Sequence, residues 1–278
     1  MPSARTLAIR AASVTAFAIA MLAVGSAVGS RGGQPSNGDA QVRLAAKQAD
    51  YRRPTSIPVP ASNPLTPERV KLGERLFKEQ RLSANDTVSC ATCHDPALAF
   101  SDGVALGKGI AKEPLKRHTP SLWNLAWART YFWDGRAATL ESQARGPIEH
   151  VQEMGQPLPV GVAKLAQDAG YRAAFAEAFT NDPNVTDVNI LKAIASYERT
   201  LVSPPTRFDN WILGDAGALT ASELRGFETF TGKAGCSSCH SGWAFTDHAF
   251  HDIGLPGDDL GRGPVIGLSS KVIVPEVK

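Results

Sequence analysis

Methionine and cysteine are scarce in this chain of 278 residues, and it has almost no net charge. It carries 29 Lys and Arg residues against 27 Asp and Glu residues. Two of the basic residues, Arg5 and Arg10, belong to an N-terminal segment without acids, so the remainder has 27 charges of each sign. A balanced chain lacks the basic excess that binds phosphate backbones, and we expect no nucleic-acid partner.

An apolar run follows these arginines, from Ala11 to Gly29. A basic start, an apolar run and the small residues Ala27 and Gly29 at its end are typical of a secretory signal peptide over residues 1–29. The run approaches the ~18 apolar residues of a spanning helix, so an uncleaved membrane anchor is the alternative. Both interpretations predict export, and we expect a periplasmic protein.

The composition changes after the signal. Residues 30–63 are rich in Gly, Ser, Pro and polar residues and show no helical period, which predicts a flexible tether. Folded structure is expected from about Pro64. Strand-like alternation is missing and the connections are rich in Pro and Gly, so the sequence predicts an all-α fold with long loops.

Two expected helices begin alike. Thr66 followed by Pro67 starts one in "LTPERVKLGERLF", and Thr220 with Glu223 has capping-box spacing in "LTASELRGFETF". Each helix carries a Gly-x-x-x-Phe step and leads into a Cys-x-x-Cys-His motif. This internal repeat predicts two copies of one module, in domains over residues 64–212 and 213–278.

Between the two motifs lie further helical patterns. The segment "NVTDVNILKAIASYERTLVSPP" predicts a helix that Pro204 and Pro205 stop. Its apolar stripe consists of Ile190, Ile194, Tyr197 and Leu201. The segment "LAQDAGYRAAFAEAF" predicts a helix interrupted at Gly170.

All four cysteines belong to the two motifs, which are Cys90, Cys93 and His94, and Cys236, Cys239 and His240. In an exported chain the pairs could be disulfides, and four converging thiolates could bind zinc. A thiol redox pair would favour a βαβ context, which the sequence lacks. Only covalent c-type haem also explains the histidines, as axial iron ligands, so the sequence predicts two haem c groups.

The other axial position of each iron decides its chemistry. A sixth ligand from Met or His gives an electron-transfer centre, whereas an open position lets a small molecule bind. Met1 and Met21 lie in the signal segment, which leaves only Met154 in the rest of the chain.

Several blocks in order, from about Pro64 onward, resemble one family. They are "CATCHDPALAFSDG", "TPSLWN", "YFWDGRAATLESQ", "GPIEHVQEMG", "SYERTLVSPPTRFDNW" and "CSSCH". The chain resembles the bacterial di-haem cytochrome c peroxidases, which include the enzyme that matures methylamine dehydrogenase. The resemblance implies two cytochrome c-like haem domains, with hydrogen peroxide split at the N-terminal haem.

The resemblance also implies partners and site residues. The C-terminal haem would receive electrons from a small cytochrome c or cupredoxin, and members are often homodimers. Trp133 matches the tryptophan between the haems, and Gln143 and Glu153 match the polar residues above the peroxidatic iron. Peroxide cleavage needs a group that takes a proton from one oxygen and returns it to the other, which suits Glu153 in an apolar pocket. Without the resemblance, Glu153 would be a helix-surface carboxylate and Trp133 a core aromatic.

The chain departs from the family at His118, where an asparagine commonly contributes to a calcium site. Imidazole suits calcium poorly, so calcium is a doubtful cofactor. His118 is also the only histidine in the loop from which some members supply a removable iron ligand. We therefore hypothesise a five-coordinate peroxidatic haem that needs no reductive activation. His150 likewise stands where an asparagine is common.

The C-terminus departs further. No Met or Tyr follows Cys239, although the family supplies its sixth ligand from that region. We expect a fragment with a partial second domain, and the alternatives are His248 or His251 as ligand or an incomplete site. Besides a peroxidase, the open functions are a di-haem electron-transfer cytochrome, an enzyme that oxidises a partner protein, and an inactive remnant.

Overall fold

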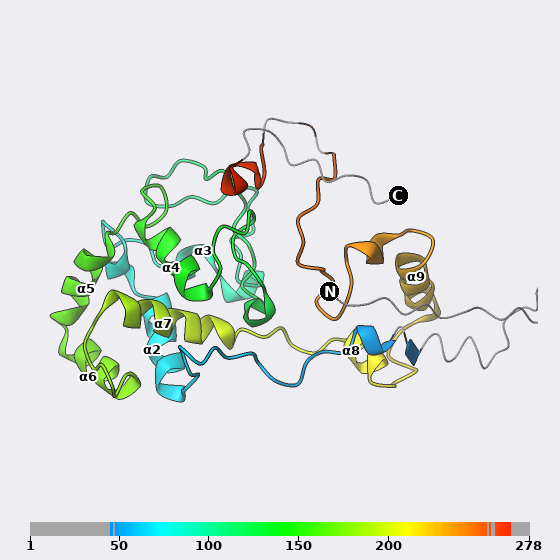
Figure 1. Cartoon of the computed structure of the whole chain (residues 1–278), viewed down its shortest axis with the longest axis horizontal. Helices are drawn as coiled ribbons and strands as arrows, with labels where there is room; N and C mark the ends of the chain where they lie inside the picture. Colours follow the sequence, from blue (N-terminus) through cyan, green and yellow to red (C-terminus); the bar gives the residue numbers. More distant parts are fainter. Residues whose placement is uncertain (1–44, 47, 255, 257–258, 268–278) are drawn as a thin grey trace, which may run out of the picture. The chain divides into compact units, whose positions relative to one another are not determined.

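The computed structural model describes residues 45–46, 48–254, 256 and 259–267 (Figure 1). The expected signal peptide lies outside these residues. Chain contacts group the described residues into one unit. Within the described part, no helix has the length and apolar character needed to cross a membrane.

Helices joined by long loops make up the described structure. The α-helices are α2 (Pro67–Phe77), α3 (Cys90–Cys93), α4 (Leu140–Glu149), α5 (Leu158–Ala166), α6 (Ala169–Ala178), α7 (Asp187–Arg199), α8 (Arg207–Ile212) and α9 (Ala221–Thr231). Short 3₁₀ turns are η1 (Gln80–Leu82), η2 (Pro96–Leu98), η3 (Leu125–Trp127), η4 (Cys236–Ser238) and η5 (Gly263–Ile266). The described residues form three isolated β-bridges and no strand, which confirms the all-α prediction.

Both predicted helix starts are confirmed. The Thr66 side chain caps α2 by accepting a hydrogen bond from the Arg69 amide, and Pro67 occupies the first turn. At α9, the Thr220 hydroxyl accepts from the Glu223 amide while the Glu223 carboxylate accepts from the Thr220 amide at 2.8 Å. Each cap satisfies amide groups that the first helical turn leaves without a partner.

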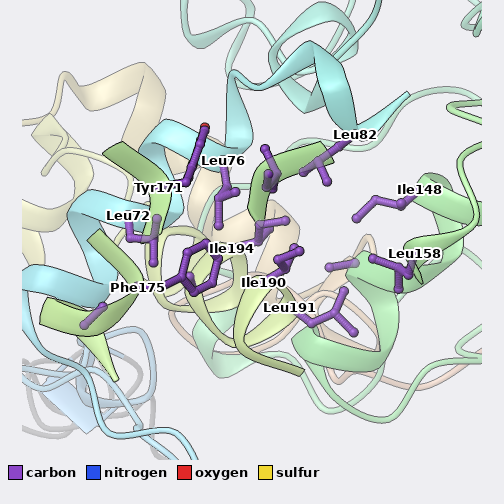
Figure 2. Packing of buried hydrophobic residues seen from close by; sticks show 14 of the residues in the cluster. Leu72, Leu76, Leu82, Ile148, Leu158, Tyr171, Phe175, Ile190, Leu191 and Ile194 are labelled. Carbon is purple, nitrogen blue, oxygen red and sulfur yellow. The ribbon is translucent and has the colours of Figure 1, made fainter. Parts of the chain in front are cut away.

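The main core lies where α2 and α7 cross and where α4, α5 and α6 cover them (Figure 2). The crossing is close because a β-carbon at Gly73 would overlap the Ala193 carbonyl group. The large side chains that fill this core with almost no exposure include Leu76, Leu82, Leu158, Tyr171, Phe175, Ile190 and Ile194. Each contributes roughly 1.5–3 kcal/mol by burial, so this core rigidly supports the loops around the first motif.

Two helix boundaries differ from the prediction. α7 ends at Arg199, before Pro204, because the chain turns at Thr200 and then buries Leu201 in a separate cluster. The break between α5 and α6 falls at Asp168, two residues before Gly170. The Asp168 carboxylate accepts hydrogen bonds from the amides of Gly170 and Tyr171, so an N-cap begins a new helix there.

A second cluster is aromatic. Tyr51 lies with Phe208 and Trp211 of α8 and Phe227 of α9, and the Tyr51 and Phe227 ring centroids are 5.2 Å apart. Tyr51 is buried, as is Asn63, so packed residues occur within the segment that composition indicated as a tether. α8 packs with α9 although it precedes residue 213. The domain boundary at 212/213 stays a prediction.

Candidate haem-binding sites

The first motif lies on a single helical turn, α3. Its start is fixed by the Ser89 amide, which donates to the Thr92 hydroxyl at 2.9 Å. Cys90 and Cys93 are three residues apart and therefore point to one side of the turn. All four cysteines are free thiols in the structure, which leaves them available for thioether bonds.

The thiol environment fits covalent attachment better than metal ligation. Burial raises the pKa of the Cys90 thiol to about 12 and also raises that of Cys93. A metal site would need thiolates, which these environments disfavour. In the described residues the four sulfurs form no common cluster, and the one group with ligand spacing is Cys239, Asp247 and His251.

His94 is held in the orientation that an iron ligand needs. Its Nδ1 donates to the Phe100 carbonyl oxygen at 2.7 Å, which leaves the Nε2 lone pair for a metal. Ala99 and Phe100 both have φ near 57°, and these left-handed residues turn the loop back toward the ring. Burial lowers the His94 pKa, which favours the neutral imidazole that ligates.

The second motif holds its histidine in the same way. His240 Nδ1 lies 3.1 Å from the carbonyl oxygen of Phe245, which also has a positive φ, 53°. The sequence prediction missed these phenylalanines. Their signal was present, because each motif is followed by Ala-Phe and then Ser-Asp or Thr-Asp, at 99–102 and 244–247.

Glu153 lies near the first motif. Its carboxylate contributes to the raised pKa of Cys93, so the two groups are neighbours. The Glu153 carbonyl accepts from the Ile110 amide at 2.8 Å, and Gly109 lets the loops meet because a β-carbon there would overlap the Glu153 backbone. The same loop supplies Lys108, whose carbonyl oxygen is 3.9 Å from Cys93 Sγ.

The Glu153 carboxyl is electrostatically unusual. Its side chain is 29% exposed, and burial raises its pKa, while His150 and Arg136 oppose that rise. His150 Nδ1 lies 3.6 Å from Glu153 Oε1. A partly buried carboxyl with a raised pKa can both accept and donate a proton near neutral pH.

Gln143 and Trp133 occupy different surroundings. Gln143 is half-buried in α4, and the structure contains no hydrogen bond from its side chain to Glu153. Trp133 is 55% exposed and donates from Nε1 to the His118 carbonyl oxygen at 2.8 Å. Trp133 is therefore no core aromatic, and the inferred roles of both residues stay predictions.

His118 uses both ring nitrogens within its loop. Nδ1 lies 2.7 Å from the Val104 carbonyl oxygen, and Nε2 lies 3.2 Å from the Ser101 hydroxyl. Neither nitrogen is free to ligate a metal in this arrangement. Calcium binding stays untested.

The two alternative ligands of the second haem differ. His251 Nε2 lies 2.8 Å from Asp247 Oδ2, so Nδ1 is the nitrogen that could ligate a metal in this arrangement. Burial and then Arg129 lower the His248 pKa, which favours neutral imidazole. A role for either histidine as a sixth ligand stays a prediction.

Two Cys-x-x-Cys-His motifs, each with a carbonyl-anchored histidine, are consistent with haem c attachment at both places. The fold and the site thus define a c-type haem protein of the all-α class. Residues 67–217 match the di-haem cytochrome c peroxidase family, and the chain belongs to that family.

Named relatives agree with this assignment. The chain is 50% identical over 224 residues to the methylamine utilization protein MauG of Methylorubrum extorquens, covering 80% of this chain and 64% of the relative. It is 34% identical over 212 residues to the cytochrome c peroxidase Ccp of Escherichia coli, covering 75% and 44%. A crystal structure of a MauG-like protein associated with microbial copper homeostasis matches with a TM-score of 0.69 and 32% identity, covering 77% of this chain and 70% of that one. The chain thus spans less than two thirds of the length of these curated relatives.

Proposed function

We propose that this chain is the haem-bearing part of a periplasmic enzyme that uses hydrogen peroxide as its oxidant at the first motif. The observation that carries the proposal is the Glu153 carboxyl, which is near enough to Cys93 to contribute to the raised pKa of that thiol and whose own pKa is raised by burial. Residues that only hold an electron-transfer haem would not need such a group.

Haem attached at Cys90 and Cys93 would supply a redox-active iron able to bind one peroxide oxygen. Protein side chains would carry out the proton transfers. Glu153 would accept a proton from one peroxide oxygen and return it to the other, so that one oxygen could leave as water. His150 and Arg136 limit how far the Glu153 pKa rises, and Gln143 orients the substrate.

Each turnover takes up two electrons, and we assign their delivery to the second motif at Cys236, Cys239 and His240. A small cytochrome c or cupredoxin is the proposed donor. Trp133 is the proposed relay between the haems.

A second candidate is oxidation of a partner protein, with the electrons taken from its side chains. The observation that favours it is the higher identity to the methylamine utilization protein MauG, 50%, than to the Escherichia coli peroxidase, 34%. The peroxide chemistry at Glu153 would be the same in both cases.

The test is steady-state peroxide consumption by the haem-loaded protein with a reduced cytochrome or cupredoxin as donor. We expect Glu153→Gln to lower the rate by about 10²–10⁴-fold, the usual effect of losing a general acid–base group. Glu177→Gln, on an exposed residue of α6, is the matched control and should leave the rate unchanged. A wild-type rate no better than that of free haem would favour an electron carrier. Peroxide-driven oxidation of a protein, without turnover of either donor, would favour the second candidate.

A further inference from the structure

The carbonyl anchors of the two histidines are unequally protected. Phe100 is 5% exposed, and its carbonyl oxygen lies 2.7 Å from His94 Nδ1. Phe245 is 37% exposed, and its carbonyl oxygen lies 3.1 Å from His240 Nδ1. Burial of its own residue therefore fixes the first carbonyl, whereas the second depends on contacts from other parts of the chain.

The second anchor closes a tight turn over residues 242–245. The Phe245 amide donates to the Gly242 carbonyl oxygen at 3.0 Å, and the φ angles of these residues are 53° and 67°. Trp243 is the second residue of this turn and lies three residues after His240. A contact that holds the Trp243 ring therefore also holds the turn that directs the Phe245 carbonyl.

Two side chains from distant parts of the sequence hold Trp243. Arg53 lies over the ring, with Cζ 5.6 Å from its centroid. Trp127 of η3 packs edge to face against the same indole, with ring centroids 5.0 Å apart. A guanidinium over an indole face is attracted by the negative potential of the ring, so the Arg53 contact is favourable as well as close.

The Arg53 guanidinium is itself held by several acceptors. Nη2 donates to the Ser203 carbonyl oxygen at 2.7 Å and to Ser203 Oγ at 3.0 Å, and Nη1 donates to the Pro204 carbonyl oxygen at 3.1 Å. Asp209 adds an ion pair at 3.5 Å, in which the two side chains are 19% and 14% exposed. Asn124, which precedes η3, also donates to Ser203 Oγ at 3.0 Å. The two contacts of Trp243 are thus joined through Ser203.

The segment that carries Arg53 also reaches the anchor itself. Tyr51 is 5% exposed, and its ring centroid lies 5.2 Å from that of Phe245. Composition predicts a tether over these residues, yet Tyr51 and Arg53 contact Phe245 and Trp243 of the second motif. An ordered contact of this kind can transmit a change in the N-terminal segment to the iron ligand.

We propose that Arg53 is a positioning residue for the haem at the second motif. By holding Trp243, it keeps the Phe245 carbonyl in the place that orients His240. A histidine that donates from Nδ1 is a more basic ligand and favours ferric iron, so weakening this bond raises the midpoint potential. The inference requires haem at the second motif but not the proposed peroxide chemistry.

Redox titration of the haem-loaded protein tests this role. Phe245→Pro and Phe100→Pro, which cannot adopt a positive φ, identify the midpoint potential of each haem. We expect Arg53→Met to raise the midpoint that Phe245→Pro raises and to leave the other unchanged. Arg53→Lys keeps the charge opposite Asp209 but lacks the planar fork, so it should recover only part of the shift. Arg52→Met, on the exposed neighbour, is the matched control and should change neither midpoint.

Hydrogen exchange followed by mass spectrometry adds a readout at the turn itself. Arg53→Met should speed exchange of the Phe245 amide by about tenfold or more, the effect expected when charge-assisted hydrogen bonds no longer oppose local opening. The Phe100 amide, which donates to the Asp95 carbonyl oxygen at 2.8 Å, should exchange as in the wild type. Trp127→Leu removes the other contact of Trp243 and should move both readouts in the same direction, so it serves as the test if Arg53→Met does not fold.

An unchanged midpoint in Arg53→Met would overturn the proposal, and a lower free energy of unfolding beside it would leave Arg53 a structural role only. Equal shifts of both midpoints, or full recovery by Arg53→Lys, would also overturn it. Neither readout uses peroxide, so failure of this proposal is distinguishable from failure of the proposed enzymatic function.

Discussion

Glu198 is a buried carboxyl whose removal should change the pH dependence of stability. It is 5% exposed, and burial raises its pKa from 4.5 to about 8, with Arg199 opposing and Glu141 supporting the rise. One of its oxygens has no hydrogen-bond partner, and neither does one Arg199 nitrogen. Its charge also affects Cys90 and Tyr131, so it titrates inside the first module.

The raised pKa means that the folded state binds a proton that the unfolded state has lost. The contribution of Glu198 is therefore greatest below pH 4.5 and is lost as the pH rises toward about 8. From pH 4.5 to 7, at about 1.4 kcal/mol per pH unit, this loss is roughly 3 kcal/mol as an upper limit. Glu198→Gln keeps the shape and removes the titration.

Between pH 4.5 and 7, we expect the free energy of unfolding of the variant to rise relative to that of the wild type by up to about 3 kcal/mol. Urea unfolding of the haem-loaded proteins at several pH values measures this change. Subtracting the wild-type curve of stability against pH from that of the variant removes the contributions of the titratable groups that both proteins contain. Glu177→Gln, on an exposed carboxyl, should follow the wild type. Parallel curves for wild type and Glu198→Gln would refute the reasoning.

Three further outcomes are expected. Phe175→Ala empties a fully buried site in the main core and should lower the free energy of unfolding by about 3–5 kcal/mol in urea denaturation, and a loss under 1 kcal/mol would mean that the core collapses around it. Trp133→Phe should slow electron transfer between the haems in stopped-flow measurements with haem content unchanged, and equal rates would remove its relay role. Phe100→Pro cannot adopt the positive φ that aims its carbonyl at His94, so it should lower the ferrous iron–histidine stretching frequency in resonance Raman spectra, whereas Phe100→Leu should preserve it.

The parts of the fold that local chemistry decides could be predicted from the sequence. Thr66 and Thr220 cap helices because a hydroxyl at that position satisfies free amides, whatever the rest of the chain does. The end of α7 could not be predicted in this way. Leu201 continues the helical stripe in sequence, but a separate cluster buries it after the chain has turned. Tyr51 is similar, since its burial depends on α8 and α9, which lie more than 150 residues away.

The candidate site likewise contains residues that could be predicted from the sequence and residues that could not. The motif residues were predictable because thioether attachment and iron ligation dictate residue type and spacing. The anchors of His94 and His240 were not, because a main-chain carbonyl carries no side-chain signature. The raised Glu153 pKa was expected only through the resemblance, since burial is a property of the folded chain.

The backbone anchors also explain why the two motifs tolerate different spacings. Phe100 follows its histidine by six residues and Phe245 by five, yet both carbonyls reach Nδ1. A side-chain acceptor would require one fixed spacing from the histidine. A main-chain carbonyl requires only that its residue has a positive φ, which turns the chain back toward the imidazole ring. The identity of the phenylalanine must then come from packing. Phe100 contacts Trp123 with ring centroids 4.9 Å apart, and Phe245 contacts Tyr51 at 5.2 Å. The packing of these rings therefore helps to set how rigidly each histidine is held.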